Sequence, residues 1–297
     1  MLTAETLRGV YSAIVTPFKS DESIDEQALR KQTEYVVENG CHAIMSTGGT
    51  GEFPHMSREE RKEATAIIVD QTGGRIPVIA GTAGCSTREA ICLAQDAQEV
   101  GASAAILTPT YYFKIPESGL NQHFSDVAGA VDIPVVIYNN PLYTGNPMSP
   151  QLMADIMQHP NIIGGKLSQN DMGQLVETIR LTSGQVSVNT GIDSQFYPAL
   201  CVGSRGIFST ASCVIPRAMV DIYDHFMAGR HEQARVLHMK VQVLNRFLEY
   251  DPGYVAPAKE ALAMLGIPCG APRKPLPNLT PEEREGVKNA LKQLKML

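Results

Sequence analysis

The sequence predicts a (β/α)8 TIM barrel with a C-terminal helical extension. Short apolar runs rich in β-branched residues alternate with helix-length segments from residue 10 to residue 208. This alternation indicates parallel strands joined by helical crossovers. Eight runs match the usual strand number of a closed barrel. The runs are Val10–Val15, Ala43–Met45, Pro77–Ala80, Ala104–Leu107, Pro134–Tyr138, Ile162–Gly165, Val186–Val188 and Gly206–Phe208.

Helix starts between these runs are marked by capping residues. Ser57 and Ser86 each stand three residues before a glutamate, which is the spacing of a capping box. Ser149 and Thr280 are each followed by proline, which favours the first position of a helix. The segments after these residues are therefore predicted to be helices.

The alternation stops after Pro216, and the rest of the chain shows only helical patterns. A proline-rich stretch, residues 268–281, interrupts them. We therefore divide the chain into a barrel of residues 1–224 and a C-terminal helical region of residues 225–297 packed on it. The helices expected near and within this region are Met219–Ala228, His231–Leu248, Ala256–Leu265 and Pro281–Leu297.

Composition narrows the class of protein. The chain has 297 residues, a formal charge of −6, 43% hydrophobic residues and no Trp. These values are typical of a globular protein, and no apolar run approaches the ~20 residues of a membrane helix. An acidic chain binds nucleic acid and anionic membranes poorly. Six scattered cysteines and the lack of a secretory signal predict reduced thiols in the cytoplasm.

In a barrel of this type, the chemistry takes place at the carboxyl ends of the strands. The residues that follow the eight runs are hydroxyls, glycines, phenols and one lysine. No pair of carboxylates stands there, which argues against glycoside hydrolysis. No cluster of Asp, Glu and His suits a divalent metal. The hydroxyls, phenols and lysine are therefore expected to converge on one face of the barrel.

Lys166 is the most informative of these residues. It follows the apolar run Ile162–Gly165, which ends inside the predicted barrel. Burial would disfavour the ammonium, lower the lysine pKa and leave a neutral amine that can attack a carbonyl. The alternative is a strand-end lysine whose amine extends to solvent. Position alone leaves both interpretations open.

Two further motifs carry more than one interpretation. Gly48–Glu52 is neither a P-loop nor a dinucleotide fingerprint. Its amides could hold a small anion such as a carboxylate, whereas the simpler interpretation is a turn that needs positive φ. Tyr138 could transfer a proton at the barrel mouth, or it could simply pack its ring. Tyr111 and Tyr112 are open to the same two interpretations.

Together these features resemble the dihydrodipicolinate synthase/N-acetylneuraminate lyase family. The resemblance covers nearly the whole chain. It implies a (β/α)8 barrel with a helical tail, usually assembled as a tetramer of two dimers. It also implies a class I lysine mechanism without a metal or an organic cofactor. The motifs that carry it are Gly48–Glu52, Tyr138–Pro141 with Thr144–Gly145, Lys166, and Gly203–Ser209.

The resemblance implies catalytic roles for three residues. Lys166 would form the Schiff base with the 2-oxo group of pyruvate or a related acid. Tyr138 would transfer protons near the carbinolamine. Tyr111 matches a family tyrosine that reaches into a neighbouring subunit's site, with Tyr112 as a rival for that role.

Substrate binding is expected at Thr50, Gly51, Gly49, Tyr143 and Phe208. By the resemblance, Thr50 and the Gly51 amide would hold the substrate carboxylate. Gly49 stands where the family commonly has a hydroxyl residue, which links two tyrosines in a proton relay in dihydrodipicolinate synthases. Tyr143 replaces an arginine that binds the carboxylate of aspartate semialdehyde, and this change removes a bidentate clamp.

The sequence thus predicts a Schiff-base lyase or aldolase that acts on pyruvate or a related 2-oxo acid. One alternative is 4-hydroxy-tetrahydrodipicolinate (dihydrodipicolinate) synthase, which condenses pyruvate with aspartate semialdehyde. Another is a dehydratase of a sugar-derived 2-oxo acid, and a third is a binding protein that has lost the reaction. We expect a cytoplasmic homotetramer, a small-molecule substrate and no nucleic-acid or membrane partner.

Overall fold

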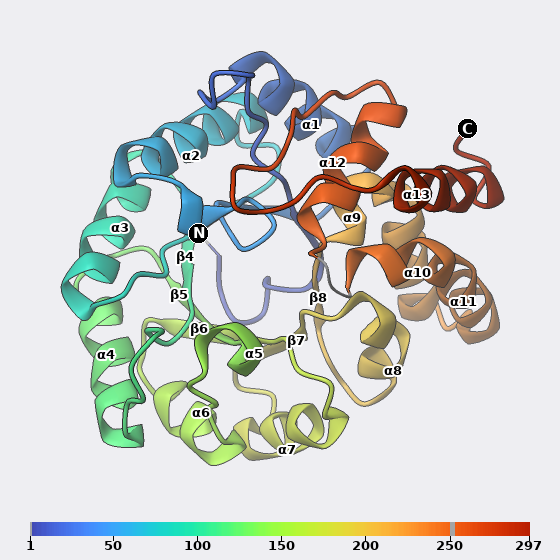
Figure 1. The fold of residues 1–297 in the computed structure, drawn as a ribbon. Helices are drawn as coiled ribbons and strands as arrows, with labels where there is room; N and C mark the ends of the chain where they lie inside the picture. Colours follow the sequence, from blue (N-terminus) through green and yellow to red (C-terminus); the bar gives the residue numbers. More distant parts are fainter. Residues whose placement is uncertain (1, 250–252) are drawn as a thin grey trace.

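A computed structural model describes residues 2–249 and 253–297. Eight parallel strands close into a barrel in sequence order, and helices surround it (Figure 1). β8 returns to pair with β1, where Gly9 lies opposite Gly206. The predicted (β/α)8 fold is therefore confirmed. The strands are β1 (Gly9–Ala13), β2 (Ala43–Ser46), β3 (Val78–Gly81), β4 (Ala104–Leu107), β5 (Val135–Asn139), β6 (Ile162–Leu167), β7 (Ser187–Thr190) and β8 (Gly206–Ser209).

The end of β6 differs from the prediction in a way that matters for the site. The predicted run stops at Gly165, but the strand continues through Lys166 to Leu167. Lys166 is paired in register with Tyr138 on β5 and Asn189 on β7. The barrel ladder therefore fixes the backbone on both sides of the lysine.

The helices around the barrel begin largely as their caps predict. Ser57 forms both bonds of a capping box with the third helical residue. Ser86 also caps its helix, but the Glu89 carboxylate accepts from the Cys85 N–H at 2.7 Å instead of reciprocating. The helices of the ring are α1 (Glu26–Glu38), α2 (Arg58–Thr72), α3 (Thr87–Glu99), α4 (Glu117–Gly129), α5 (Pro141–Thr144), α6 (Pro150–Ile156), α7 (Met172–Thr182) and α8 (Phe196–Cys201).

The C-terminal part of the described chain is helical, as predicted. α10 begins at Pro216, three residues before the predicted start, and α13 ends at Gln293 instead of Leu297. The division between residues 224 and 225 lies within α10 and stays a prediction. None of the helices in the described parts has the length and apolar character needed to cross a membrane. The helices of the C-terminal part are α9 (Ala211–Val214), α10 (Pro216–Met227), α11 (His231–Leu248), α12 (Val255–Met264) and α13 (Pro281–Gln293).

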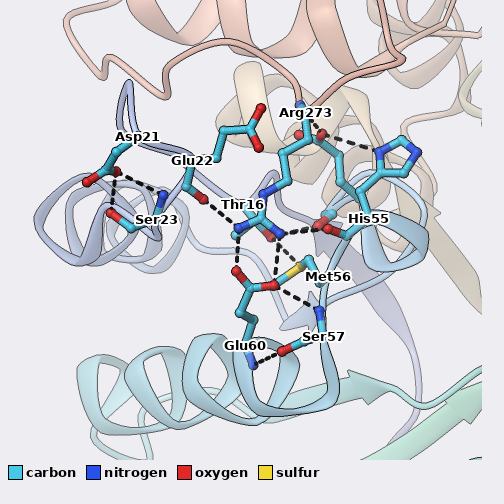
Figure 2. Close-up of polar contacts among 11 residues, drawn as sticks. Thr16, Asp21, Glu22, Ser23, His55, Met56, Ser57, Glu60 and Arg273 are labelled. Atoms are coloured by element: carbon cyan, nitrogen blue, oxygen red, sulfur yellow. Dashed lines mark hydrogen bonds and ion pairs between the residues drawn. The ribbon is translucent and has the colours of Figure 1, made fainter.

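The segment between α12 and α13 is attached to the mouth of the barrel by Arg273. Its guanidinium binds the Glu60 carboxylate and the backbone oxygens of Glu22 and His55 (Figure 2). Its backbone N–H donates to Glu52 Oε2 at 2.7 Å. The C-terminal region therefore holds the loops that follow β1 and β2, which lie on the side of the barrel where the site is expected.

Candidate active site

Lys166 lies at the C-terminal end of β6 and lines a cavity at the barrel mouth. Its side chain is only 5% exposed. The Nζ atom lies 3.9 Å from the centre of the Tyr138 ring and 5.7 Å from that of Phe208. In the described part of the chain, no ion pair joins this amine to a carboxylate. The amine is therefore held against aromatic faces and directed toward open space.

A glycine at the end of β7 makes room for this lysine. A Cβ atom at Gly191 would lie 2.4 Å from Lys166 Cε and 2.1 Å from Ser168 Oγ. Both distances are far below normal van der Waals contact. Any larger residue at position 191 would therefore displace the lysine from the cavity.

Tyr138 lies beside the lysine on the neighbouring strand and is 9% exposed. Its hydroxyl oxygen accepts a hydrogen bond from Asn140 Nδ2 at 2.9 Å. Because that bond uses the oxygen as acceptor, the phenol can still donate its own proton to another group. Tyr138 is thus placed to give a proton to an oxygen bound near Lys166.

The Gly48–Glu52 loop follows β2 and brings a hydroxyl to the same cavity. Thr50 is 4% exposed, and its Oγ1 lies 3.0 Å from Thr210 Oγ1. The Gly51 carbonyl accepts from Thr16 Oγ1 at 2.7 Å. Hydroxyls from the segments after β1 and β8 therefore hold this loop, one through the Gly51 carbonyl and the other through Thr50.

The glycines of this loop are not explained by backbone angle, which corrects one interpretation of the sequence. The residues with positive φ are Thr47, at 44°, and Glu52, at 61°, and none of the three glycines has one. A Cβ at Gly51 would instead lie 3.1 Å from Thr47 Cα. The glycines therefore provide space for close packing.

Two neighbouring cavities open at this face. The lysine cavity, defined by Lys166, Thr50 and their neighbours, has an empty volume of about 620 Å³, part of which is open to solvent. The outer cavity, defined by Tyr111, Thr108 and their neighbours, has about 1120 Å³. Both cavities are lined by Gly49, Tyr138, Asn140, Tyr143 and Tyr254. These five residues form the partition between the two spaces.

The structure does not bring all the predicted site residues to the lysine cavity. Tyr111 is half-buried in the outer cavity, and burial raises its pKa to about 12. Tyr112 is 88% exposed. Phe208 is buried in the barrel against Tyr11, with the ring centres 4.5 Å apart, and lines neither cavity. Gly51 is also buried outside the two linings, whereas Tyr143 lines both.

Sequence reasoning missed two acids in the lysine cavity. Asp193, three residues after β7, accepts from the Thr210 and Ala211 N–H groups at 3.1 and 3.0 Å. Burial raises its pKa, against the opposing effects of its hydrogen bonds and Lys166. Burial and Asp193 together raise the pKa of Glu249, just after α11, to about 7.

These two acids correct the expectation, based on the residues that follow the strands, that the site contains no pair of carboxyl groups. The strand ends carry no carboxylate pair, but the cavity contains two carboxyl groups from other segments. Asp193 could have been found by reading three residues beyond β7. Glu249 and Tyr254 have no local signal, because the C-terminal region brings them to the cavity through tertiary packing. Among residues 2–249 and 253–297, no group of three or more His, Cys, Asp or Glu could hold a metal.

A closed barrel with a buried amine at the carboxyl end of a strand defines an enzyme of the (β/α)8 class, in which the loops after the strands carry the chemistry. The family model that matches this chain is the dihydrodipicolinate synthetase family, over residues 6–294. The chain belongs to this family.

Curated relatives and solved structures agree with the family model. The 4-hydroxy-tetrahydrodipicolinate synthase of Archaeoglobus fulgidus is 37% identical over 289 residues, which cover 97% of this chain and 99% of the relative. The dihydrodipicolinate synthase structure from Aquifex aeolicus has a TM-score of 0.93 and 35% identity, and covers 98% and 99% of the two chains. That of Acinetobacter baumannii, complexed with pyruvate, has a TM-score of 0.93 and 34% identity, covering 98% and 100%.

Proposed function

We propose that the protein is a Schiff-base lyase that makes or breaks a C–C bond of pyruvate or a related 2-oxo acid. The observation that carries this proposal is the Lys166 amine, which faces a cavity and has no ion-pair partner in the described part of the chain. An amine in that position can add to a carbonyl carbon. The complex of the Acinetobacter baumannii relative with pyruvate supports this choice of substrate.

The reaction needs no change of oxidation state in the protein. The Lys166 nitrogen adds to C2 of the 2-oxo acid, and the resulting carbinolamine takes up a proton and loses water to give an imine. The protonated imine withdraws electrons from C2, so that C3 loses a proton and becomes an enamine carbon. This carbon bonds to the carbonyl carbon of an aldehyde, whose oxygen takes up a proton, and water then releases the product and the free lysine. Cleavage is the reverse sequence.

We assign the proton transfer at the departing oxygen to Tyr138, whose phenol lies beside the amine and keeps its own proton available. Thr50 and the Gly51 amide would bind the substrate carboxylate. Tyr111 would act from the outer cavity. Groups fixed in this way stabilise the adduct without rearrangement of solvent.

The alternative activity is that named for the relatives, 4-hydroxy-tetrahydrodipicolinate synthase, in which the acceptor carries a second carboxylate. Among the described residues that line the two cavities there is no arginine, and the position expected for one is Tyr143. We therefore favour an acceptor with hydroxyl groups over aspartate semialdehyde. A dehydratase of a sugar-derived 2-oxo acid would use the same imine.

A direct competition between acceptors tests this choice. The protein is supplied with pyruvate and either aspartate semialdehyde or glyceraldehyde, and the products are measured by mass spectrometry. We expect glyceraldehyde to react roughly tenfold or more faster, because a site without a paired cation leaves a bound carboxylate unsatisfied. Faster turnover of aspartate semialdehyde would establish the synthase alternative. Tyr143→Arg should raise the aspartate semialdehyde rate and serves as the matched variant.

We further propose a cytoplasmic homotetramer built from two dimers. Two adjacent exposed aromatic side chains, Tyr112 and Phe113, support burial of this surface by another copy of the chain. The six cysteines, all free, support a reducing compartment. Analytical ultracentrifugation of the wild type and of Tyr112→Ser with Phe113→Ser would test the assembly, and a wild-type monomer would contradict it.

A further inference from the structure

A tyrosine from the C-terminal region fills the side-chain position of Gly49. A Cβ atom at Gly49 would lie 2.5 Å from the Tyr254 hydroxyl oxygen and 3.8 Å from its Cζ. The first distance is too short for any real Cβ, whereas the second is ordinary contact. Gly49 does not have a positive φ. The contact with the Tyr254 hydroxyl is therefore the structural reason for glycine at this position.

The Tyr254 hydroxyl lies in the partition between the lysine cavity and the outer cavity. Tyr254 lines both spaces, as do Tyr138 and Tyr143. Its ring packs edge-on against the Tyr143 ring, with the centres 6.4 Å apart. A hydroxyl at this point can exchange protons with groups in either cavity.

An ion pair made by α12, the helix that begins after Tyr254, holds the Tyr254 hydroxyl in place. Tyr254 is the N-cap residue of α12, and the same helix carries Lys259. Lys259 Nζ lies 2.5 Å from Glu52 Oε1, and Glu52 follows Gly49 by three residues. The ion pair therefore fixes α12 against the loop that contains Gly49. Burial raises the pKa of Tyr254 well above its ordinary value, so the hydroxyl stays neutral and can both donate and accept.

Tyr138 needs such a neighbour if it is to act more than once. Its side chain is only 9% exposed, and Asn140 donates to its oxygen. After Tyr138 gives its proton to a departing oxygen, that proton must be replaced before the next turnover. Tyr138 and Tyr254 both line the lysine cavity and the outer cavity, so Tyr254 is the neighbouring phenol that can replace this proton.

We infer that Tyr254 is the proton-relay residue of this site, and that Gly49 is glycine because it admits the Tyr254 hydroxyl. The proton that leaves Tyr138 is replaced from Tyr254, which is reprotonated from water in the outer cavity, so no proton is lost over a cycle. Tyr254 thus acts through Tyr138 and supplies from the C-terminal region the hydroxyl that the family commonly carries at position 49. This inference rests on the proposed Schiff-base function.

Three variants separate the hydroxyl from the space that it fills. Tyr254→Phe removes the hydroxyl and leaves the ring. Because a Cβ at position 49 would then meet only the ring carbon at 3.8 Å, a side chain fits there. Gly49→Ser with Tyr254→Phe puts a hydroxyl back close to the vacated position. Gly49→Ala with Tyr254→Phe fills the same space without a hydroxyl and is the matched control.

The measurement is exchange of the pyruvate C3 hydrogens with D2O, followed by NMR, because exchange requires formation of the imine and the enamine. We expect Tyr254→Phe to slow exchange roughly tenfold to hundredfold. The serine double variant should regain at least roughly tenfold, and the alanine double variant should not, because only a hydroxyl can pass a proton. Wild-type exchange in Tyr254→Phe, or equal rates in the two double variants, would overturn the inference.

Two further results keep this test separate from that of the proposed function. Borohydride should trap pyruvate on Lys166 in the wild type; a wild type that gives no adduct contradicts the Schiff-base function itself. An adduct together with variants that exchange alike contradicts only the relay. The single variant Gly49→Ala, with Tyr254 intact, should lower the melting temperature because its Cβ meets the hydroxyl. An unchanged melting temperature would contradict the geometry on which the relay depends.

Discussion

Lys166 and Lys259 are both buried lysines, but their surroundings differ completely. Their side chains are 5% and 2% exposed. Lys259 Nζ lies 2.5 Å from Glu52 Oε1 and donates to the Ala271 carbonyl at 3.2 Å. Lys166 has no carboxylate partner in the described chain and lies 3.9 Å from the centre of the Tyr138 ring. Burial alone therefore does not identify a nucleophilic amine; the partner of the amine does.

The two lysines divide two tasks between them. Lys259 packs 4.4 Å from the centre of the Phe18 ring and holds Glu52, the last residue of the Gly48–Glu52 loop. Its charge is used to keep that loop in place. Lys166 faces the cavity, where its nitrogen is free to react. The same substitution should therefore have a different effect at each lysine: loss of catalytic activity at Lys166 and loss of stability at Lys259.

The largest expected effect is the loss of turnover in Lys166→Met. This variant keeps the apolar stem and removes the amine, so covalent catalysis is lost and the rate should fall by roughly a thousandfold or more. Its unfolding free energy should change by less than about 1 kcal/mol, because no ion pair is broken. Steady-state assays and denaturant titration measure the two quantities. Full activity in this variant would contradict the covalent mechanism.

The second effect is the loss of stability in Lys259→Met. Removal of one partner leaves Glu52 buried without its counter-charge, which costs about 3–5 kcal/mol in comparable buried pairs. The melting temperature should fall by roughly 10 °C. Below that temperature, Lys166 should still form an adduct with pyruvate. A melting temperature equal to that of the wild type would show that the pair does not hold the loop.

The carboxyl groups near the two lysines extend the comparison. Glu52 is ion-paired, whereas burial and Asp193 raise the pKa of Glu249 from 4.5 to about 7. A carboxyl whose pKa is raised on folding binds its proton more tightly in the folded state. Its contribution to stability is therefore fully present below pH 4.5 and is lost as the pH rises through about 7.

Glu249→Gln should remove this dependence on pH. The free energy of unfolding of the variant, measured relative to that of the wild type, should rise by on the order of 1–2 kcal/mol between pH 5 and pH 8. Solvent screening at a half-buried site makes this smaller than the full effect. Melting temperatures measured at the two pH values give the difference. A difference between variant and wild type that stays constant from pH 5 to pH 8 would contradict the raised pKa.

Much of the barrel could be predicted because its signals are local. Each strand is a short apolar run, and even the three-residue runs of β2 and β8 correspond to real strands. Lys166 stood out for a local reason too, since a charged residue directly after an apolar run is unusual. The strand extended through Lys166 because pairing with Tyr138 and Asn189 outweighs the polar side chain.

The remaining site residues depend on contacts between distant parts of the chain. Glu249 and Tyr254 reach the lysine cavity because α11 and α12 pack on the barrel, and nothing in their own neighbourhood in the sequence indicates it. Gly49 has the same explanation, since its partner is 205 residues away in the chain (254 − 49). The positive φ angles at Thr47 and Glu52 were also hidden, because non-glycine residues seldom adopt them.

The measurement that tests the central claim most directly is borohydride trapping with pyruvate, followed by digestion and mass spectrometry of the peptides that contain the two lysines. The account predicts a reduced pyruvate adduct on Lys166 and none on Lys259, and no adduct on either in Lys166→Met. An adduct on Lys259, or an unmodified Lys166 after treatment with pyruvate and longer 2-oxo acids, would contradict it.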